Sequence, residues 1–325
     1  MWNLVADVGG THMRLAALSL TGGIEDQTRF ASDSDLTVPE VCARFIAHQR
    51  SSPACIVIAA AGMVHEGVVK LTNARQTLTE ADLTGISPAS QVKILNDFEA
   101  AAWSLATVAQ DDVEMLQGTL DNASAPRLII GPGTGLGVGA LIRGKGSPQV
   151  VSGEGGHVGV GPRHPQEVPY FETLVANNPE FQFGTTLTVE AEAILSGTGI
   201  PFFYQAVAQS MKLGAPLARA EDVFGAAREG TDQAAVVAVR IFRDALGGLA
   251  GDLGLIFGAR GGVFITGGVA QSNPWLFDAA FLAAFNAGGR HTGWRWQLPV
   301  CLYQNTNFGL IGARNYIATQ MASGK

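Results

Sequence analysis

The sequence predicts an α/β protein of two domains with a cleft, and three observations lead to that prediction. The chain has 325 residues, which is too long for one compact core to be expected. Short apolar runs typical of buried strands alternate with segments of helical spacing. Two stretches, Val5–Ala16 and Ile129–Ala140, each enter a Gly-Thr turn from one apolar run and leave it as another, which favours a duplicated fold.

The first predicted domain begins with a β-hairpin around the first of these turns. Its strands are expected at Leu4–Ala6, Arg14–Leu20, Ala54–Ala61 and Gln91–Leu95. Apolar residues then repeat at helical spacing, which predicts a helix over Phe98–Ala109. Asn96 and Asp97 therefore fall where a strand meets a helix, at the carboxyl edge of a sheet. Open α/β sheets bind their ligands at that edge.

The second predicted domain follows a polar stretch and has its own strands and helices. Its strands are expected at Leu128–Ile130, Gly137–Ile142, Gln149–Ser152 and Gly262–Thr266. Helices are expected at Glu190–Leu195, from Thr231 to about Ile256, and at Phe308–Arg314. The segment Arg163–Thr186, with three prolines and little periodicity, is expected to be a loop.

The composition disfavours several classes of protein. Hydrophobic residues make up 47% of the chain and charged residues 15%, which argues against disorder. The net charge of −7, without a block of like charge, disfavours a nucleic-acid partner. No basic leader is present and no apolar stretch reaches the ~18 residues of a membrane span, so we expect a cytoplasmic protein without a membrane partner. The three separated cysteines indicate neither a disulfide framework nor a zinc site.

The glycines and threonines of the two turns suit a phosphate ligand. Gly9, Gly10 and Thr11 can point backbone N–H groups and a hydroxyl at one anion, and the second turn repeats the pattern with Thr134. Asp7 lies beside the first turn. A carboxylate there would repel phosphate unless a divalent cation lay between them, so Asp7 indicates Mg²⁺ held through water. The alternative is a hairpin turn in which Asp7 only caps backbone groups.

Two other glycine motifs fit the second turn only nominally. Gly139 to Gly146 approaches a P-loop, but a glycine replaces the metal-binding hydroxyl residue and no helix is expected to follow. Gly135–Ala140 has the glycine spacing of a dinucleotide-binding motif, yet it continues as a strand where that motif needs a helix. Both interpretations are therefore rejected.

Asn96-Asp97 is the candidate for the chemical step. A hydroxyl that attacks ATP needs a carboxylate within hydrogen-bond reach to accept its proton, and Asp97 offers one. An N-cap is the alternative, since Asn or Asp before a helix commonly stabilises it by ~1 kcal/mol. From the residues alone the cap is favoured, and the two roles are compatible.

The loop Gly153–His157 is the candidate for binding a polyol. Its two inner glycines make a helix improbable, so Glu154 and His157 are not expected to form a helical metal site. In a rigid glycine loop they can instead converge on sugar hydroxyls, each of which both donates and accepts. The alternative is a turn with a satisfied histidine. Glu192, on a predicted helix, and Asn73, after an alternating run, are weaker candidates.

Seven motifs in this order resemble the bacterial glucokinase family of the actin/hexokinase/Hsp70 ATPase superfold. They extend over nearly the whole chain: Asp7–Thr11, Leu71–Asn73, Leu95–Phe98, Gly131–Gly137, Gly153–His157, Ala191–Gly197 and Phe264–Gly268. The resemblance implies a two-domain ribonuclease-H-like (actin-like ATPase) fold with a central cleft. Residues 1–106 plus 298–325 would form the small domain and residues 107–297 the large one. The chain lacks the Cys-rich zinc motif of the repressor/ORF/kinase (ROK) relatives, which places it outside that branch.

The same resemblance implies roles for individual residues. Asp97 would be the general base when the γ-phosphoryl of ATP passes to the 6-hydroxyl of glucose. The remaining sugar contacts would come from Asn73, Asn96, Gly133, Glu154, His157 and Glu192. ATP would lie against Gly9, Gly10, Thr11, Thr134, Gly135, Gly267 and Gly268, with Asp7 holding Mg²⁺ through water. A homodimer is implied as well.

The chain departs from the family's pattern near the sugar segment. Ala60-Ala61 stand where relatives often have a proline, Gln76 where many have a tryptophan, and His12 replaces a frequent asparagine. Two alternatives to a glucokinase therefore stay open. One is a kinase of another hexose or amino sugar. The other, less favoured because the base and phosphate motifs are intact, is a non-catalytic sugar sensor.

Overall fold

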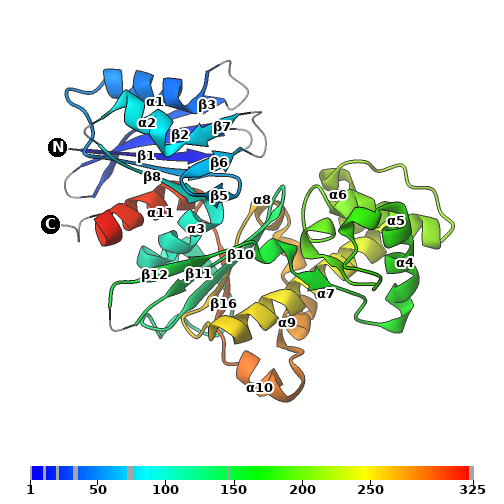
Figure 1. Ribbon diagram of the computed structural model, residues 1–325. Coiled ribbons are helices and arrows are strands. Elements are labelled where there is room, and N and C mark those ends of the chain that lie inside the picture. The colour runs from blue at the N-terminus through cyan, green and yellow to red at the C-terminus, as the bar shows by residue number, and fades with distance from the viewer. Residues whose placement is uncertain are drawn as a thin grey trace. The chain divides into compact units, whose positions relative to one another are not determined.

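The computed structural model (Figure 1) describes the chain except residues 1, 10–11, 20–21, 32–35, 72–75, 89, 145 and 322–325. Its contacts divide it into two compact units. Unit 1 is Met1–Ala109, Gly139–Ser152 and Asn305–Lys325, and unit 2 is Gln110–Val138 and Gly153–Gln304. The boundary thus falls inside strand β11 (Leu136–Ile142). The domain bounds implied by the resemblance, 1–106 plus 298–325 and 107–297, stay a prediction.

Unit 1 is built on a mixed five-stranded sheet of order β3-β2-β1-β4-β8. Strand β2 pairs antiparallel with both β1 and β3, whereas β4 pairs parallel with both β1 and β8. The bounds are β1 Asn3–Val8, β2 His12–Leu18, β3 Ile24–Ala31, β4 Cys55–Ala60 and β8 Gln91–Asn96. A small antiparallel sheet adds β5 Val64–His65, β6 Val68–Lys70 and β7 Thr77–Thr79, and β12 (Gln149–Ser152) pairs with β11.

The helices of unit 1 pack on its five-stranded sheet. They are α1 Val38–Ala47, α2 Glu80–Ile86, α3 Asp97–Ser104 and α11 Phe308–Tyr316. A capping box starts α1, because Thr37 accepts from the Glu40 amide while the Glu40 carboxylate accepts from the Thr37 amide at 2.7 Å. An apolar core, which includes Leu4, Val41 and Ile58, fills the space between the sheet and helices α1 and α2.

Helices α3 and α11 approach each other at a glycine (Figure 1). A Cβ added at Gly312 of α11 would overlap the carbonyl group of Ala100 in α3, so only glycine permits this distance. The Asn315 amide then donates to the Trp103 carbonyl at 3.0 Å and to the Thr107 hydroxyl at 2.9 Å. The close packing and these bonds hold α3, and with it Asp97 at its first turn, on α11.

Unit 2 has a sheet in which β10, β15, β16 and β9 are neighbours in that order. The first three are parallel and β9 is antiparallel to β16. Their bounds are β9 Val113–Gln117, β10 Arg127–Pro132, β15 Val263–Ile265 and β16 Val300–Tyr303, and a separate pair is formed by β13 Gly159–Val160 and β14 Val189–Glu190. The helices are α4 Val168–Asn177, α5 Ile200–Ser210, α6 Ala220–Glu229, α7 Gln233–Phe257, α8 Gly268–Ser272, α9 Ala279–Asn286 and α10 Thr292–Arg295.

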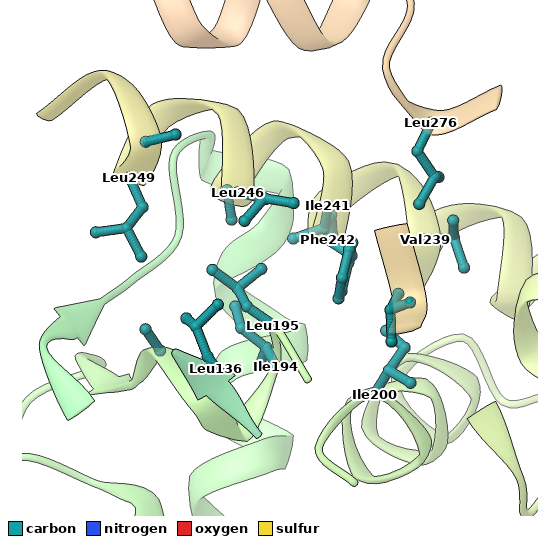
Figure 2. Close-up of a cluster of buried hydrophobic side chains, with 14 of the residues drawn as sticks. Leu136, Ile194, Leu195, Ile200, Val239, Ile241, Phe242, Leu246, Leu249 and Leu276 are labelled. Atoms are coloured by element: carbon teal, nitrogen blue, oxygen red, sulfur yellow. The ribbon is translucent and has the colours of Figure 1, made fainter. Parts of the chain in front are cut away.

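The core of unit 2 lies under its long helix α7. Asp232 caps α7 by accepting from the Ala235 amide at 2.9 Å, and Gly258 ends it in a left-handed conformation with φ 59°. Figure 2 shows Leu246 and Leu249 of α7 facing Leu136 and Leu195 from segments far away in the sequence. Burial of each such leucine stabilises the fold by roughly 1.5–3 kcal/mol.

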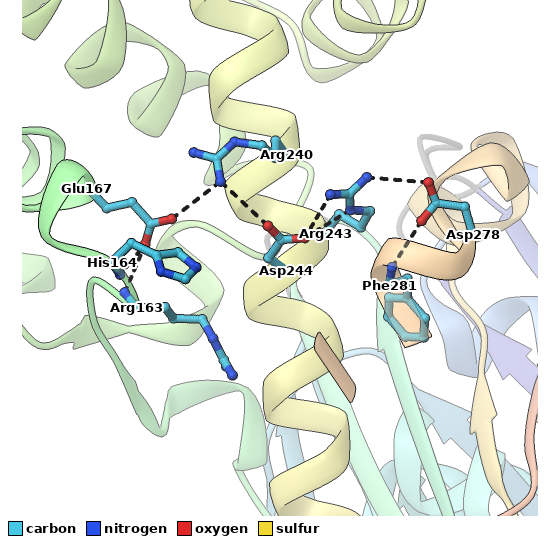
Figure 3. A network of polar contacts seen from close by, with 8 residues as sticks. All are labelled: Arg163, His164, Glu167, Arg240, Arg243, Asp244, Asp278 and Phe281. Carbon is cyan, nitrogen blue, oxygen red and sulfur yellow. Dashed lines mark hydrogen bonds and ion pairs between the residues drawn. The ribbon is translucent and has the colours of Figure 1, made fainter. Parts of the chain in front are cut away.

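An ion-pair network fixes α7 to two neighbouring elements of unit 2 (Figure 3). The buried Glu167, in a 3-10 turn before α4, lies 3.6 Å from Arg240, and Arg240 lies 3.6 Å from Asp244. Arg243 lies 2.9 Å from Asp244 and 3.4 Å from Asp278, which is the N-cap of α9. Because Glu167 also accepts from the amide of Arg163 at 2.8 Å, its buried charge is both paired and hydrogen-bonded.

The structure confirms the predicted strands and corrects two other predictions. Glu190–Leu195 is not a helix: Val189–Glu190 is a strand and Ala191–Ala193 a single 3-10 turn. The chain folds back there, since a Cβ at Gly199 would overlap Ala193. Arg163–Thr186 is not a loop, because it contains α4. Its prolines stand at the start of turns and helices, where proline is tolerated.

Two further outcomes concern helices. The helix predicted over Phe98–Ala109 is shorter: α3 ends at Ser104 and a 3-10 turn continues to Thr107. Within the described residues no helix is both long and apolar enough to cross a membrane.

Candidate functional site

The parallel strands of unit 1 bring Gly9, where the first predicted phosphate turn begins, and Asp97 to one edge of the sheet. Val8 of β1 pairs with Ala60 of β4, and Ala60 pairs with Asn96 of β8. Gly9 therefore follows the last paired residue of β1, and Asp97 follows the last paired residue of β8. Strand β4 lies between these two strands. With ~4.8 Å between neighbouring strands, the separation of β1 from β8 is on the order of 10 Å. Gly10, Thr11 and Asn73, also predicted as contacts, lie outside the described residues.

Asn96 is the N-cap of α3. Its Oδ1 accepts from the amides of Phe98 at 2.9 Å and Glu99 at 3.2 Å, and its Nδ2 donates to the Gly62 carbonyl at 2.9 Å. The cap interpretation of this position is thus confirmed. Among the described residues these bonds use the side-chain oxygen and one N–H, so the other N–H can donate to a sugar hydroxyl.

Asp97 is the first residue of α3 and is half-buried. Its Oδ1 accepts from the Phe98 amide at 3.0 Å. Since Asn96 already caps the helix, Asp97 is not needed for that role. The positive end of the helix macrodipole favours a negative charge at this position. A carboxylate held by a backbone amide at the first turn of a helix is a group that can act as a general base.

Asp7 is buried at the end of β1 and forms an ion pair with Arg14. Its Oδ2 accepts from Arg14 Nη2 at 2.6 Å, and Arg14 also donates to the Thr306 carbonyl at 2.8 Å. Burial raises the pKa of the Asp7 carboxyl, against the lowering effect of Arg14. A Cβ at Gly309 would lie 2.6 Å from the Asp7 carboxyl carbon, so the start of α11 closes over this pair.

The ion pair changes the argument for magnesium. Arg14 neutralises much of the Asp7 charge, so a cation is not the only way to relieve repulsion between Asp7 and a phosphate. Among the described residues no three His, Cys, Asp or Glu side chains gather as a metal site. The donor set therefore fits an ion bound mainly by substrate phosphates and water, which is how Mg²⁺ is usually held beside nucleotides.

The second phosphate turn in unit 2 is bound to the segment that follows Glu192. The Gly133 amide donates to the Gly135 carbonyl at 2.8 Å and closes the turn. The Gly197 amide donates to the Gly133 carbonyl at 2.7 Å. The Thr134 carbonyl accepts from the amide of Thr198 at 3.2 Å and from its hydroxyl at 2.9 Å. The amides of Thr134 and Gly135 remain the candidates for a phosphate.

Glu192 itself lies against this turn. Its Oε2 accepts from the Leu136 amide at 2.7 Å, and a Cβ at Gly135 would lie 2.5 Å from the same oxygen. Glu192 is a weaker candidate on a predicted helix, where a glutamate usually faces solvent. It is instead half-buried and hydrogen-bonded to the turn.

His157 lies between two carboxylates in unit 2. Its Nε2 is 3.6 Å from Oε2 of Glu154, and its Nδ1 contacts the carboxylate of Glu190. Residues 155–157 form one 3-10 turn, and a Cβ at Gly156 would overlap the Leu136 carbonyl, so the glycines let this turn pack on β11. Partial burial lowers the pKa of His157, but the Glu190 hydrogen bond and the charges of Glu190, Glu192 and Glu154 together raise it.

We predict that Glu190→Gln lowers the pKa of His157. The folded protein favours the imidazolium, so the stability from this interaction is fully present below the ordinary pKa of 6.5 and is lost as the pH rises through the raised value. An NMR titration of the His157 ring in both proteins measures the shift. Removal of the exposed Glu180 carboxylate by Glu180→Gln is the control. A pKa of His157 unchanged by Glu190→Gln would contradict the assigned contact.

The predicted adenosine motif adjoins the second phosphate turn. Thr266 donates its amide to the Ile130 carbonyl at 3.0 Å. Gly267 has φ 94°, and a Cβ there would lie 2.5 Å from the Pro132 carbonyl oxygen, so glycine is required. Gly268 starts α8, and a Cβ at that position meets nothing within 4 Å. An open backbone at this place leaves room for a ligand.

Each unit thus gathers a part of the predicted site. Unit 1 brings together Asp7, Gly9, Asn96 and Asp97, and unit 2 brings together Gly133, Thr134, Gly135, Glu154, His157, Glu192, Gly267 and Gly268. Arg14, Glu190 and Thr198 were not predicted as site residues. Arg14 and Glu190 each lie close to a residue that was singled out, and charge near a motif is the signal that could have found them. Thr198 carries no such signal.

Comparisons with known proteins agree with this arrangement. The Glucokinase family model matches residues 4–320. A glucokinase of Sinorhizobium medicae is 35% identical over 302 residues, covering 91% of this chain and 86% of that protein. A glucokinase of Mesorhizobium japonicum is 32% identical over 319 residues, covering 96% and 90%. The crystal structure of a glucokinase from an Antarctic psychrotroph has a TM-score of 0.84 at 27% identity and covers 98% of each chain.

The likeness to that solved glucokinase confirms the predicted α/β fold class. The match of the family model over nearly the whole chain agrees with the seven ordered motifs. The chain belongs to the glucokinase family.

Proposed function

We propose that the chain transfers the γ-phosphoryl of ATP to the 6-hydroxyl of glucose, with Asp97 as the general base. The register of unit 1 supports the proposal, because Asp97 follows β8 at the sheet edge where Gly9 follows β1 and the predicted phosphate turn begins. Family membership supports the reaction class. Asp97 would accept the proton of the hydroxyl as its oxygen forms the bond to phosphorus, and ADP would leave.

The other site residues would orient the two substrates. Glu154, His157 and Glu192 offer acceptors and a ring donor from one part of unit 2, which suits the several hydroxyls of a hexose. Asn96 would donate from its remaining N–H, and Asn73 is proposed with it. The amides around Gly9, Gly10 and Thr11, and those of Thr134 and Gly135, would bind phosphates. Gly267 and Gly268 would lie against adenosine.

Magnesium is proposed as the partner of ATP. When bound, it would neutralise negative charge on the phosphate oxygens. Asp7 would hold it through water, and Arg14 keeps the Asp7 carboxylate in place through the 2.6 Å hydrogen bond. The homodimer and the cytoplasmic location stay predictions.

A panel of sugars in a coupled ADP-release assay tests the proposed function. We expect the highest kcat/KM with glucose. The Gln76 side chain, which stands where many relatives have tryptophan, accepts from the Val38 amide at 3.4 Å rather than offering an aromatic face. A higher kcat/KM with another hexose or an amino sugar would favour the first alternative. Sugar binding without ADP release from Mg·ATP would establish a sensor.

A further inference from the structure

We propose that Glu192 is a positioning residue that links the sugar to the second phosphate turn, so that sugar and nucleotide strengthen each other's binding. The inference rests on the proposed function and concerns how its two substrates communicate. It assigns to one carboxylate two contacts at once, a backbone amide of the turn and a hydroxyl of the sugar.

The first contact is present in the structure. Oε2 of Glu192 accepts from the Leu136 amide at 2.7 Å, at the point where the turn passes into β11. The absence of a side chain at Gly135 makes room for this oxygen, since a Cβ there would lie only 2.5 Å from it. Glycine at this position thus serves the carboxylate as well as a phosphate.

The second contact would be made by the other oxygen of the Glu192 carboxylate. A carboxylate has two oxygens, and the turn occupies Oε2, so Oε1 is the atom offered to a sugar hydroxyl. The negative charge of Glu192 acts on His157, which places the carboxylate in the same group as the other predicted sugar contacts. The Ala191 amide also donates to the Val158 carbonyl at 2.8 Å, which ties Glu192 to the His157 turn.

The segment around Glu192 is docked firmly on the turn. Besides the Glu192 bond, Gly197 and Thr198 bind the carbonyls of Gly133 and Thr134. Leu136 and Leu195, one from each segment, belong to one buried cluster under α7 (Figure 2). A sugar that orients the Glu192 carboxylate therefore acts on the Leu136 amide and the turn. If bound sugar strengthens nucleotide binding through this turn, linkage requires bound nucleotide to strengthen sugar binding by the same factor.

The variant Gly135→Ala tests the link without any nucleotide. The new methyl group would push against Oε2 of Glu192, so we expect the Kd for glucose of the nucleotide-free protein to rise about tenfold. Gly268→Ala is the matched control, because it alters another predicted nucleotide contact where a Cβ meets nothing within 4 Å. Its glucose Kd should stay within about twofold of the wild type. An unchanged glucose Kd in Gly135→Ala would overturn the inference.

A second pair of variants keeps the inference testable if Gly135→Ala does not fold. Glu192→Asp retains the charge but is too short to reach both partners, and Glu190→Asp shortens the neighbouring carboxylate that contacts His157 instead. Glucose is titrated calorimetrically with and without a non-hydrolysable ATP analogue. We expect at least about fivefold coupling in the wild type and in Glu190→Asp, and none in Glu192→Asp.

The outcomes separate the two claims. Coupling that persists in Glu192→Asp, or a wild type that binds glucose without coupling, overturns the link and leaves the kinase proposal intact. A wild type that binds no glucose at all refutes the proposed function first.

Discussion

Replacement of Asp97 by asparagine is expected to lower kcat for glucose by about 10²–10⁴-fold. The amide keeps the size of the side chain and an oxygen that can accept from the Phe98 amide, so the first turn of α3 stays intact. It cannot accept the proton of the attacking hydroxyl. Because Asn96 makes the cap, the free energy of unfolding should change by less than about 0.5 kcal/mol. The coupled ADP-release assay and a thermal melt measure both quantities.

Glu99→Gln is the matched control for Asp97→Asn. Glu99 is another carboxylate of the first turn of α3, two residues further on, and it plays no part in the proposed chemistry. Burial raises its pKa above the usual value. We expect this variant to keep kcat within about threefold of the wild type, which is small beside the effect of losing a base. If Asp97→Asn loses no more activity than Glu99→Gln, Asp97 is not the base.

Replacement of Gly312 by alanine is expected to lower the free energy of unfolding more than the other Gly→Ala changes proposed here. The added Cβ would overlap the Ala100 carbonyl, and the obstacle is backbone rather than a flexible side chain. Helices α3 and α11 must then separate. Overpacking of this kind costs about 3 kcal/mol or more, which corresponds to a melting temperature lower by roughly 10 °C. Activity should fall as well, since Asp97 begins α3.

Gly225→Ala provides the opposite case in another helix. Gly225 lies inside α6, and a Cβ there meets nothing within 4 Å. Alanine restricts the unfolded chain more than glycine does, so this change should stabilise the protein by about 0.5–1 kcal/mol. Calorimetry of both variants shows whether each change raises or lowers the melting temperature. A Gly312→Ala protein that melts at or above the wild-type temperature would show that α3 and α11 are not in the close contact described.

The fold was predictable where one local signal dominated. Apolar runs such as Ile56–Ala60 and the alternation after Gly137 gave strands at the expected places, and α7 followed its long helical pattern. The prediction failed at Glu190–Leu195, where tertiary contacts decide. Helical spacing exists in that sequence, but hydrogen bonds to Val158 and to the second phosphate turn bend the chain into a 3-10 turn. No local pattern reports bonds made with residues 33 to 64 positions away.

The candidate site shows the same division. Glycine, threonine and a carboxylate after a strand indicate a phosphate turn and a base, because those residue types are rarely needed together for packing alone. The ion pair of Asp7 with Arg14 and the contact of His157 with Glu190 were not predicted. A sequence shows which charges are present, and only the paired strands of a sheet show which of them meet. Here the strand pair β1–β2 sets Asp7 opposite Arg14.

The composition of unit 1 has a consequence for how the protein is made. Residues 305–321, including α11, are translated after every residue of unit 2. Yet α11 packs against α3 and β1 of unit 1. While a ribosome is still producing unit 2, the face of α3 around Ala100 lacks the helix that packs on it. We therefore expect unit 2 to reach its native form first on the ribosome, and a nascent chain arrested before Phe308 to be held by chaperones.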